Sequence, residues 1–372
     1  MKKLVFYLPV SIFFALILLS GRAFADLPDL RGKTLFVTGT FRASGTALGE
    51  NIAEYFPDGI ELTASNPAKM VIAQSGLEDN STLTALFPLP PNTTVVNNVT
   101  YAGCTNPSLP LTGRFNRATG AFHMTGAIAG TSVFDFGVYD ASIFGIKRVL
   151  VGVKNLRVTL DGTGSIGTNG QFTIKQPGDM PFLFDISSNF FTGTPKLGLQ
   201  TPSSCGFGGT TSTIKDPSLT LSNWTMAPPS LSGRVTLEAC AMPAQPVTFI
   251  LHHSSGSDLT KTVTLGANGE FSLYDLSAAD YTVFVKGRKW LQTSTPASLL
   301  NSSIGDFSTL LLAGDINDDN AIDFGDLSIL LQSYNALIGD DLYREQADIN
   351  CDGGIDFGDL SIMLQHYNLF GD

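Results

Sequence analysis

The chain has 372 residues, enough for two or three domains, and 22 Lys and Arg against 33 Asp and Glu give it a formal net charge of −11. Residues 314–372 hold 13 acidic side chains and one arginine, a net charge of −12, which leaves the preceding 313 residues at +1. A nearly neutral body with 43% hydrophobic residues is not typical of a disordered protein, and it offers no basic stripe for nucleic-acid phosphates. The acidic segment instead indicates a cation-binding region.

The first 25 residues predict an export signal. Two lysines precede an apolar run at residues 4–19, and the small-residue pattern Ala23-Phe24-Ala25 follows it. The run of 16 residues is shorter than the about 20 that a membrane-spanning helix needs, and it contains Pro9. We therefore expect cleavage after Ala25 and a secreted or cell-surface protein, with no membrane span after cleavage.

Residues 26–225 are rich in Gly, Thr, Ser and Phe and predict a β-domain, either a sandwich or a barrel. Runs that alternate between apolar and polar residues recur between turn signals, as at residues 34–38 and 156–160. Residues 111–116 and 121–125 predict a hairpin, because the four residues between them end in glycine. Within this domain only residues 46–56 suggest a helix.

No catalytic motif stands out in this β-domain, which has no His-Glu-x-x-His, Gly-x-Ser-x-Gly or phosphate-loop pattern. His123 is its single histidine, and we expect a structural or exposed role for it. A glycoside hydrolase would need two acids about 5–10 Å apart, and sequence spacing cannot pair the available ones. The candidate acids are Glu50, Glu54, Glu61, Asp135, Asp140, Asp161 and Asp185. Carbohydrate binding on exposed aromatic side chains is the other option, and the candidate platforms are Trp224, Tyr101 and Tyr139.

Residues 226–231 predict a linker, because consecutive prolines stiffen the chain and cannot serve a central strand. Residues 232–312 then predict a second β unit. Its predicted strands cover residues 233–237, 247–252, 262–265, 270–273 and 281–285, with a tight turn at residues 266–269. His252 and His253 point to opposite faces of a strand and so cannot readily chelate one metal.

This second unit resembles the transthyretin-like or carboxypeptidase-regulatory-like β-sandwiches of secreted bacterial proteins. The resemblance is carried by Ser232-Gly233-Arg234-Val235-Thr236-Leu237 and by residues 267–273 and 281–287. It implies a small immunoglobulin-like or transthyretin-like fold and says almost nothing about activity.

The acidic tail contains an internal duplication with a period of 33 residues. Residues 315–334 align without gaps to residues 348–367, and 15 of the 20 positions are identical. In each copy, oxygen-bearing side chains occupy loop positions 1, 3, 5, 9 and 12. Calcium takes six to eight oxygen ligands, and a curled loop supplies them when alternate side chains and the carbonyl at position 7 contribute. The predicted ligands of two structural Ca²⁺ ions are Asp315, Asn317, Asp319, Ala321, Asp323 and Asp326, and then Asp348, Asn350, Asp352, Gly354, Asp356 and Asp359.

Each loop is predicted to lead into an amphipathic helix. The apolar positions follow the helical period, at Leu327, Leu330, Leu331 and Tyr334 and again 33 residues later. Position 6 of each loop must turn sharply, as Asn320 and Gly353 permit, and the isoleucine at position 8 is suited to packing between the loops. Because the carboxylates of an empty loop repel one another, we expect chelation to unfold the tail and to leave the upstream sheets folded.

Two departures from the general EF-hand pattern are informative. Position 12 is Asp326 or Asp359 in place of glutamate, and residues 309–312 before the first loop look like the end of a strand in place of a helix. In these features residues 314–372 resemble the bacterial dockerin type I family. The resemblance implies that the tail binds two calcium ions and docks through one helical face onto a cohesin module of another protein. It also implies an association with extracellular polysaccharide degradation.

The expected docking positions differ from those of dockerins in assembled cellulase complexes. Those dockerins typically carry a hydroxyl-bearing pair at positions 10 and 11 and a basic pair at positions 17 and 18. Here the pairs are Phe324-Gly325 and Leu331-Gln332, and then Phe357-Gly358 and Leu364-Gln365. Two partners for the tail therefore stay open, a cohesin-like module or the adjacent β-sandwich.

Export makes the four cysteines candidates for disulfides. Cys104 and Cys205 fall in the same predicted domain and are the expected pair. Cys240 and Cys351 fall in different modules, and the sequence leaves their pairing open.

The prediction as a whole is a mainly β protein with a C-terminal helical module that carries two EF-hand-like calcium loops. The predicted segments are an export signal (1–25), a β-rich domain of unassigned function (26–225), a linker (226–231), a β-sandwich (232–312) and the dockerin-like module (314–372). The favoured function is non-catalytic, calcium-dependent attachment or assembly outside the cell. The alternatives are a carbohydrate-binding protein, in which polysaccharide is a partner, and a glycoside hydrolase acting on O-glycosyl bonds.

Overall fold

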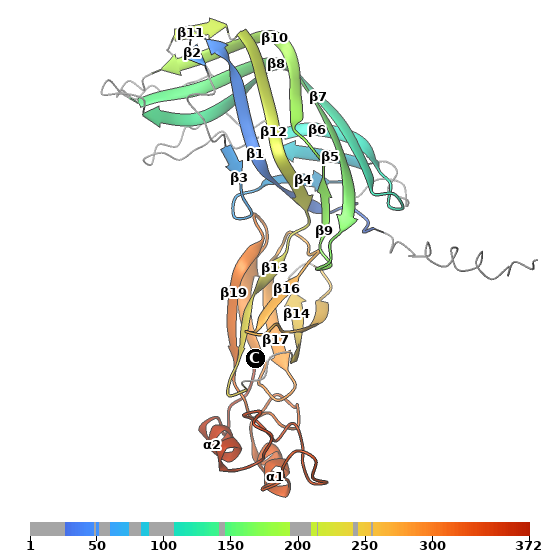
Figure 1. The fold of residues 1–372 in the computed structure, drawn as a ribbon, viewed down its shortest axis with the longest axis vertical. Helices are drawn as coiled ribbons and strands as arrows, with labels where there is room; N and C mark the ends of the chain where they lie inside the picture. Colours follow the sequence, from blue (N-terminus) through green and yellow to red (C-terminus); the bar gives the residue numbers. More distant parts are fainter. Residues whose placement is uncertain are drawn as a thin grey trace, which may run out of the picture.

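The computed structural model describes residues 27–47, 50–51, 60–73, 83–88, 108–140, 146–193, 210–213, 215–240, 245–253 and 256–372. The expected export signal and the expected pair Cys104 and Cys205 lie outside these residues, as do Glu54 and Tyr101. The described parts follow one another along the long axis of the molecule in the order β-barrel, β-sandwich and paired helices (Figure 1).

The N-terminal part is a barrel in which eight antiparallel strands close into a ring. Each strand of the ring pairs with the next, and the last pairs back with the first. In ring order these strands are β1 (Thr34–Ala47), β4 (Ala68–Ile72), β5 (Leu83–Pro88), β6 (Ser108–Phe115), β7 (Ala121–Asp140), β8 (Ile146–Ile166), β9 (Phe172–Lys175) and β12 (Lys215–Ala227). Closure of the ring decides between the two predicted architectures in favour of the barrel.

Four further strands extend the sheet beyond the ring. β2 (Glu50–Asn51) and β3 (Ile60–Leu62) both pair with β1. β10 (Met180–Gly193) pairs with the N-terminal parts of β8 and β12, whereas β9 pairs with their C-terminal parts. β11 (Thr210–Thr213) pairs with β10 and completes this extension (Figure 1).

The predicted hairpin is confirmed, and Phe115 pairs with Phe122 across β6 and β7. Its turn ends at Gly120, where φ is +75° and an added Cβ would lie 2.2 Å from the carbonyl oxygen of Gly164. Only glycine fits such a conformation so close to a backbone atom. Inside the barrel the rings of Phe115, Phe122 and Phe172 pack edge to face, with centroids 6.3 and 5.8 Å apart.

The helix suggested at residues 46–56 is wrong wherever the structure describes that segment. Thr46 and Ala47 end β1 and pair with Asn51 and Glu50 of β2. Thr46 also pairs with Lys215 of β12, so the long strand β1 continues through the start of the suggested helix. Pairing with a neighbouring strand outweighs a weak local helical pattern because strand preference depends on the surrounding sheet.

The sandwich contains two sheets, as the predicted β unit implied. One sheet has the order β16-β13-β19, and the other has the order β15-β14-β17-β18. The strands are β13 (Leu231–Leu237), β14 (Pro246–His252), β15 (Leu259–Thr264), β16 (Glu270–Leu273), β17 (Asp280–Gly287), β18 (Thr293–Ser298) and β19 (Ile304–Leu311). β18 is an edge strand, which allows it to contain Pro296.

The connection between barrel and sandwich is shorter than the predicted linker. β12 continues through Ala227 and β13 begins at Leu231, so only residues 228–230 lie between them. The backbone N–H of Ser230 donates to Ser303 Oγ at 3.0 Å, and its carbonyl accepts from the N–H of Ile304 at 3.0 Å. The connection is therefore fixed by hydrogen bonds to the sandwich.

Two helices, α1 (Phe324–Gln332) and α2 (Phe357–Gln365), follow the two acidic loops. Their buried faces belong to the same hydrophobic core as the sandwich. This shared core joins Val283, Trp290 and Leu311 of the sandwich to Leu330 of α1 and Met363 of α2. A separate core fills the barrel.

Candidate metal centre

The two acidic loops adopt the same backbone conformation. Position 6 has a positive φ in both, +69° at Asn320 and +90° at Gly353, as the sequence predicts. Position 4 is also left-handed, with φ of +66° at Asp318 and +59° at Cys351. Two such turns within three residues curl the loop so that alternate side chains face inward.

The aspartate at position 1 accepts backbone hydrogen bonds from across its own loop. Asp315 Oδ1 accepts from the N–H of Asp319 and Asp315 Oδ2 from the N–H of Asn320, both at 3.0 Å. In the second loop, Asp348 accepts the equivalent bonds from Asp352 at 3.1 Å and Gly353 at 3.0 Å. These bonds hold the carboxylate of position 1 inside each loop.

The aspartate at position 12 closes the loop from the helix side. Asp326 Oδ1 accepts from the N–H groups of Ile316 at 2.7 Å and Asn317 at 3.0 Å, and Asp326 Oδ2 accepts from the N–H of Asp323 at 2.9 Å. Asp359 makes the equivalent bonds in the second loop. Position 9 caps each helix, since Asp323 and its counterpart accept from the N–H two residues later.

These loops bury negative charge. Asp315, Asp326 and Asp359 are fully excluded from solvent, and Asp348 is 4% exposed. Burial raises the pKa of the Asp315 and Asp359 carboxyls, because a buried carboxylate loses its hydration. For Asp359 the nearby charge of Asp348 acts in the same direction. Buried carboxylates of this kind require a cation or a proton.

The donor set fits a hard cation. All twelve predicted ligands lie in the described loops, and they supply carboxylate, amide and carbonyl oxygens, with neither histidine nor thiolate among them. Across the described ranges no three His, Cys, Asp or Glu side chains form a ready-made metal cluster. Within this set the asparagine at position 3 bonds the aspartate at position 5, since Asn317 Nδ2 donates to Asp319 Oδ2 and Asn350 Nδ2 donates to Asp352 Oδ2, both at 2.7 Å.

Each loop pairs with the segment that follows the helix of the other repeat. In the first loop, the N–H of Ile322 donates to the Leu369 carbonyl at 2.9 Å, and its carbonyl accepts from Asn368 at 2.7 Å. In the second loop, Ile355 makes the corresponding bonds with residues 335 and 336. Both isoleucines are buried, at 0% and 1% exposed, as expected for position 8. The two repeats are thus interlocked.

The sandwich contacts both loops through a disulfide, whose cysteines the sequence singled out, and through two lysines that it did not. Cys240 and Cys351 form a disulfide with a Cα–Cα separation of 5.0 Å, which answers the pairing left open above. Lys286 forms an ion pair with Asp315 in the first loop, and Lys289 donates to the backbone carbonyl of Asp348 in the second. Single lysines at the end of a strand or in a turn usually face solvent, so nothing in the local sequence marked Lys286 or Lys289.

Two more contacts join the tail to the sandwich. His366 Nε2, just after α2, lies 2.8 Å from Glu238 Oε2. Asp372 Oδ2 accepts from the N–H and the hydroxyl of Ser294, both at 2.7 Å.

The face of each helix that is opposite to the face buried in the shared core is open to solvent. Phe324 and Phe357 are each 70% exposed, and Leu331 and Leu364 are 53% and 52% exposed. These four side chains occupy positions 10 and 17, counted from the start of each loop. We call Phe324 with Leu331, and Phe357 with Leu364, the apolar docking pairs. The apolar positions predicted for one helical stripe therefore fall into a buried and an exposed group, because Leu330 is buried whereas its neighbour Leu331 is exposed.

The candidate residues of the barrel do not assemble a catalytic centre among the residues described. His123 Nδ1 lies 2.5 Å from Asp161 Oδ1, with both side chains more than half exposed, and Arg157 pairs with Asp185 at 3.2 Å. Glu61 is an exposed residue of β3. Glu50, Asp135, Asp140 and Tyr139 lie in strands β2 and β7, and the structure describes only their backbone.

Of the three candidate carbohydrate platforms, the structure rules out Trp224. Its side chain is 1% exposed and packs in the barrel core, so its ring cannot stack on a sugar. In the sandwich, His252 Nδ1 lies 2.7 Å from Asp258, whereas the His253 ring packs against Tyr281. The two histidines therefore have different partners, as their opposite directions predict.

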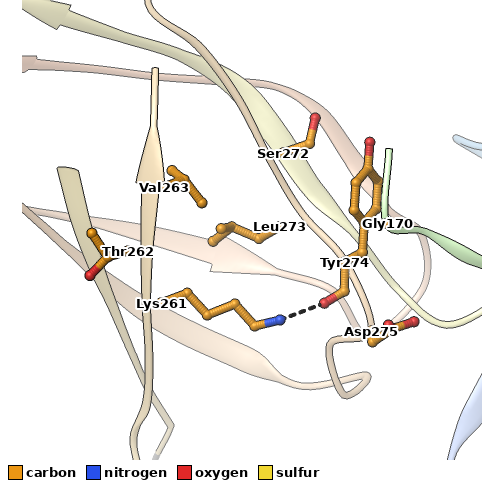
Figure 2. Close-up of a pocket in the computed structure, with 8 residues that line it drawn as sticks. All are labelled: Gly170, Lys261, Thr262, Val263, Ser272, Leu273, Tyr274 and Asp275. Atoms are coloured by element: carbon orange, nitrogen blue, oxygen red, sulfur yellow. Dashed lines mark hydrogen bonds between the residues drawn. The ribbon is translucent and has the colours of Figure 1, made fainter. Parts of the chain in front are cut away.

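A pocket of about 340 Å³ lies beside the sandwich strands β15 and β16 and the turn at Gly170 of the barrel (Figure 2). Lys261 Nζ donates to the carbonyl of Tyr274 at 2.9 Å, as Figure 2 shows. Asp275 Oδ1 is buried and has no hydrogen-bond partner among the described residues, and burial raises the pKa of this carboxyl. The Tyr274 hydroxyl accepts a bond from Asn169 at 3.2 Å, so the pocket belongs to the contact between barrel and sandwich.

Comparison with known structures gives matches of low similarity. Two crystal structures of a type II cohesin–X-dockerin complex from Acetivibrio cellulolyticus, an N-terminal and a C-terminal interface mutant, are 24% identical to this chain. Each match covers 38% of this chain and 97% of that chain, with TM-scores of 0.32 and 0.33. A tetra-tandem repeat from the extending region of a large adhesion protein is 12% identical, covers 74% of this chain and 93% of that chain, and has a TM-score of 0.14.

No curated protein matches the chain. Among the residues described, no helix has the length and hydropathy to cross a membrane. Residues 313–367 match the family model of the dockerin type I domain. This span contains both acidic loops and both helices, so the chain carries a dockerin type I domain at its C-terminal end.

Proposed function

We propose that this chain is an extracellular attachment protein whose dockerin domain binds a cohesin module of another protein. The match of residues 313–367 to the dockerin type I model carries this proposal. The duplicated loop–helix units provide two equivalent faces for such a partner, one on each helix.

The exposed apolar docking pairs support a protein partner. Phe324 and Leu331 are seven residues apart, about two turns, and so lie on the same face of α1, and Phe357 and Leu364 repeat this arrangement on α2. Large exposed apolar side chains that recur in two related places are typical of a binding surface. Since no charged residue occupies positions 10, 11, 17 or 18, the partner surface that fits them is apolar as well.

Calcium is the cation that we propose for the two loops. The supporting observation is the burial of two carboxylates in each loop beside further carboxylate, amide and carbonyl oxygens. The proposed ligands are the twelve residues at positions 1, 3, 5, 7, 9 and 12. When bound, the ion would neutralise these carboxylates and hold the helices and their docking pairs in a fixed arrangement.

The contact between tail and sandwich does not compete with this role. The tail turns Leu330, Met363 and Cys351 toward the sandwich, whereas the apolar docking pairs remain exposed. We propose that the sandwich supports the dockerin domain and that the outer helical faces bind the partner. For the barrel, none of the described side chains favours a hydrolase or a sugar-binding site over a structural role.

Binding to a panel of immobilised cohesin modules tests the proposal. We expect the full chain to bind at least one cohesin in calcium and to lose binding in excess EGTA. The double variant F324S/F357S should lose binding while its thermal unfolding stays close to that of the parent chain, because both side chains are already exposed. The matched control L300S changes an exposed leucine of the sandwich and should bind normally. Binding by F324S/F357S equal to that of the parent would refute the proposed surface.

A further inference from the structure

Lys286, at the end of sandwich strand β17, places a cation against the first acidic loop. Its Nζ lies 2.9 Å from Asp315 Oδ2 and 2.5 Å from Asp318 Oδ1. The same ammonium donates to the carbonyl of Gly287 at 2.8 Å. The Lys286 side chain is 18% exposed and that of Asp315 is fully buried, so the ion pair lies largely out of solvent.

The second loop holds the equivalent oxygen differently. Asp348 Oδ2 accepts a 2.7 Å hydrogen bond from the hydroxyl of Tyr343, a neutral donor at pH 7. Lys289 also lies near this loop, and its charge interacts with that of Asp348. Among the described contacts, however, it binds the backbone carbonyl of Asp348 and Cys351 Sγ and forms no ion pair with the carboxylate. Two loops of the same backbone therefore differ in the group that holds the first carboxylate, an ammonium in one and a phenol in the other.

We propose that Lys286 is a built-in counter-cation of the first loop, which stabilises that loop without calcium and lowers its affinity for calcium. The inference rests on the proposed calcium-binding function and adds that the two sites are unequal because the sandwich supplies this lysine. Lys286 is a positioning residue, since it acts through Asp315 and does not itself contact the ion.

The two effects have the same electrostatic cause. Without calcium, the ammonium offsets part of the repulsion between the buried carboxylates of Asp315 and Asp326. When calcium binds, the lysine and the ion are cations held on the same carboxylate, and they repel each other. Because the lysine and a divalent ion would share the Asp315 carboxylate, we expect the lysine to alter the binding constant by on the order of tenfold. Loss of the lysine should therefore weaken the empty loop and tighten the filled one.

The experiment compares the full chain with Lys286→Met. Calcium titration by calorimetry gives the affinity of both sites, and thermal unfolding in excess EGTA gives the stability of the calcium-free protein. For Lys286→Met we expect one of the two sites to tighten by on the order of tenfold, the other to stay unchanged, and the unfolding temperature in EGTA to fall. A purely structural lysine would lower stability without tightening a calcium site.

Three controls separate charge from packing. Lys286→Arg keeps the charge and should leave both affinities close to those of the parent. Lys286→Gln removes the charge but keeps a hydrogen-bonding group, and it replaces Lys286→Met if that variant fails to fold. Tyr343→Phe removes the neutral donor of the second loop and should tighten neither site.

Unchanged or weakened calcium binding in both Lys286→Met and Lys286→Gln would overturn the inference, as would an unchanged unfolding temperature in EGTA. Those results would leave calcium binding itself intact. Absence of calcium uptake by the parent chain would instead overturn the proposed metal function, and this inference with it.

Discussion

Four buried aspartates, Asp315, Asp326, Asp348 and Asp359, organise the C-terminal loops. Each accepts at least two backbone hydrogen bonds, so each replaces its hydration with fixed N–H donors. Accepting such bonds stabilises the charged form, whereas burial acts against it. These residues therefore combine a structural role with the metal-binding role proposed for them.

We expect the substitution D326A to destabilise the dockerin domain even without calcium. It leaves the N–H groups of Ile316, Asn317 and Asp323 without their acceptor, at a cost of about 1–3 kcal/mol for each donor that stays buried. Denaturant unfolding in EGTA measures the change. The exposed control D341A should alter the free energy of unfolding by less than about 0.5 kcal/mol. Equal stability of the two variants would show that Asp326 acts only through a metal.

Asp275 predicts a pH dependence at the contact between barrel and sandwich. Burial raises its pKa in the folded state above the unfolded value, so its favourable contribution is complete below the unfolded pKa and is lost as pH rises through the folded one. Acidification from pH 7 toward the unfolded pKa should therefore increase the stability contributed by this residue. The isosteric D275N should be more stable than the parent at pH 7, and the difference should shrink at lower pH. Calorimetric melting at several pH values tests this, and a difference that grows on acidification would contradict it.

At the scale of elements, the helices were predictable but their orientation was not. The 33-residue repeat and the helical spacing of leucines locate both helices within the chain, and the acidic N-caps fix their starts. The sequence does not say which side faces inward, because that depends on the sandwich surface beneath. β18 was missed for a related reason, since an edge strand with Pro296 lacks the alternating pattern of a central strand.

The neighbouring leucines of α1 provide a matched test of this orientation. Leu330 is fully buried and Leu331 is 53% exposed. We expect L330A to lower the free energy of unfolding by about 2–5 kcal/mol, because it leaves a cavity in the shared core. L331A should change it by less than about 0.5 kcal/mol and should weaken cohesin binding instead. If L331A were the more destabilising variant, the orientation of α1 against the sandwich described here would be wrong.

At the scale of the whole molecule, sandwich and dockerin domain form one core, whereas the barrel has its own. Composition and turn signals separated three modules in the sequence, but they could not reveal this union. It depends on contacts between residues far apart in the chain, such as Cys240 with Cys351 and Glu238 with His366. The sequence led us to expect that chelation unfolds the tail alone. Because the two modules share a core, we now expect loss of calcium to lower the stability of the sandwich as well.

Removal of the disulfide tests the union directly. The bond closes a sequence separation of 111 residues, and we expect C240S/C351S to lose about 2–5 kcal/mol of stability. Differential scanning calorimetry should show one transition for sandwich and dockerin domain together and a separate one for the barrel. In the variant, the first transition should move to lower temperature and the second should stay in place. A shift of the barrel transition instead would contradict the division into two cores.

The same sulfur bridge has a mechanical consequence. When force is applied through α2, which follows Cys351, while the barrel is tethered elsewhere, the tension passes from Cys351 through the disulfide to Cys240 and bypasses the strands that this loop encloses. Single-molecule stretching should therefore release no length from residues 241–350 until a reductant is added, after which the extra extension should appear.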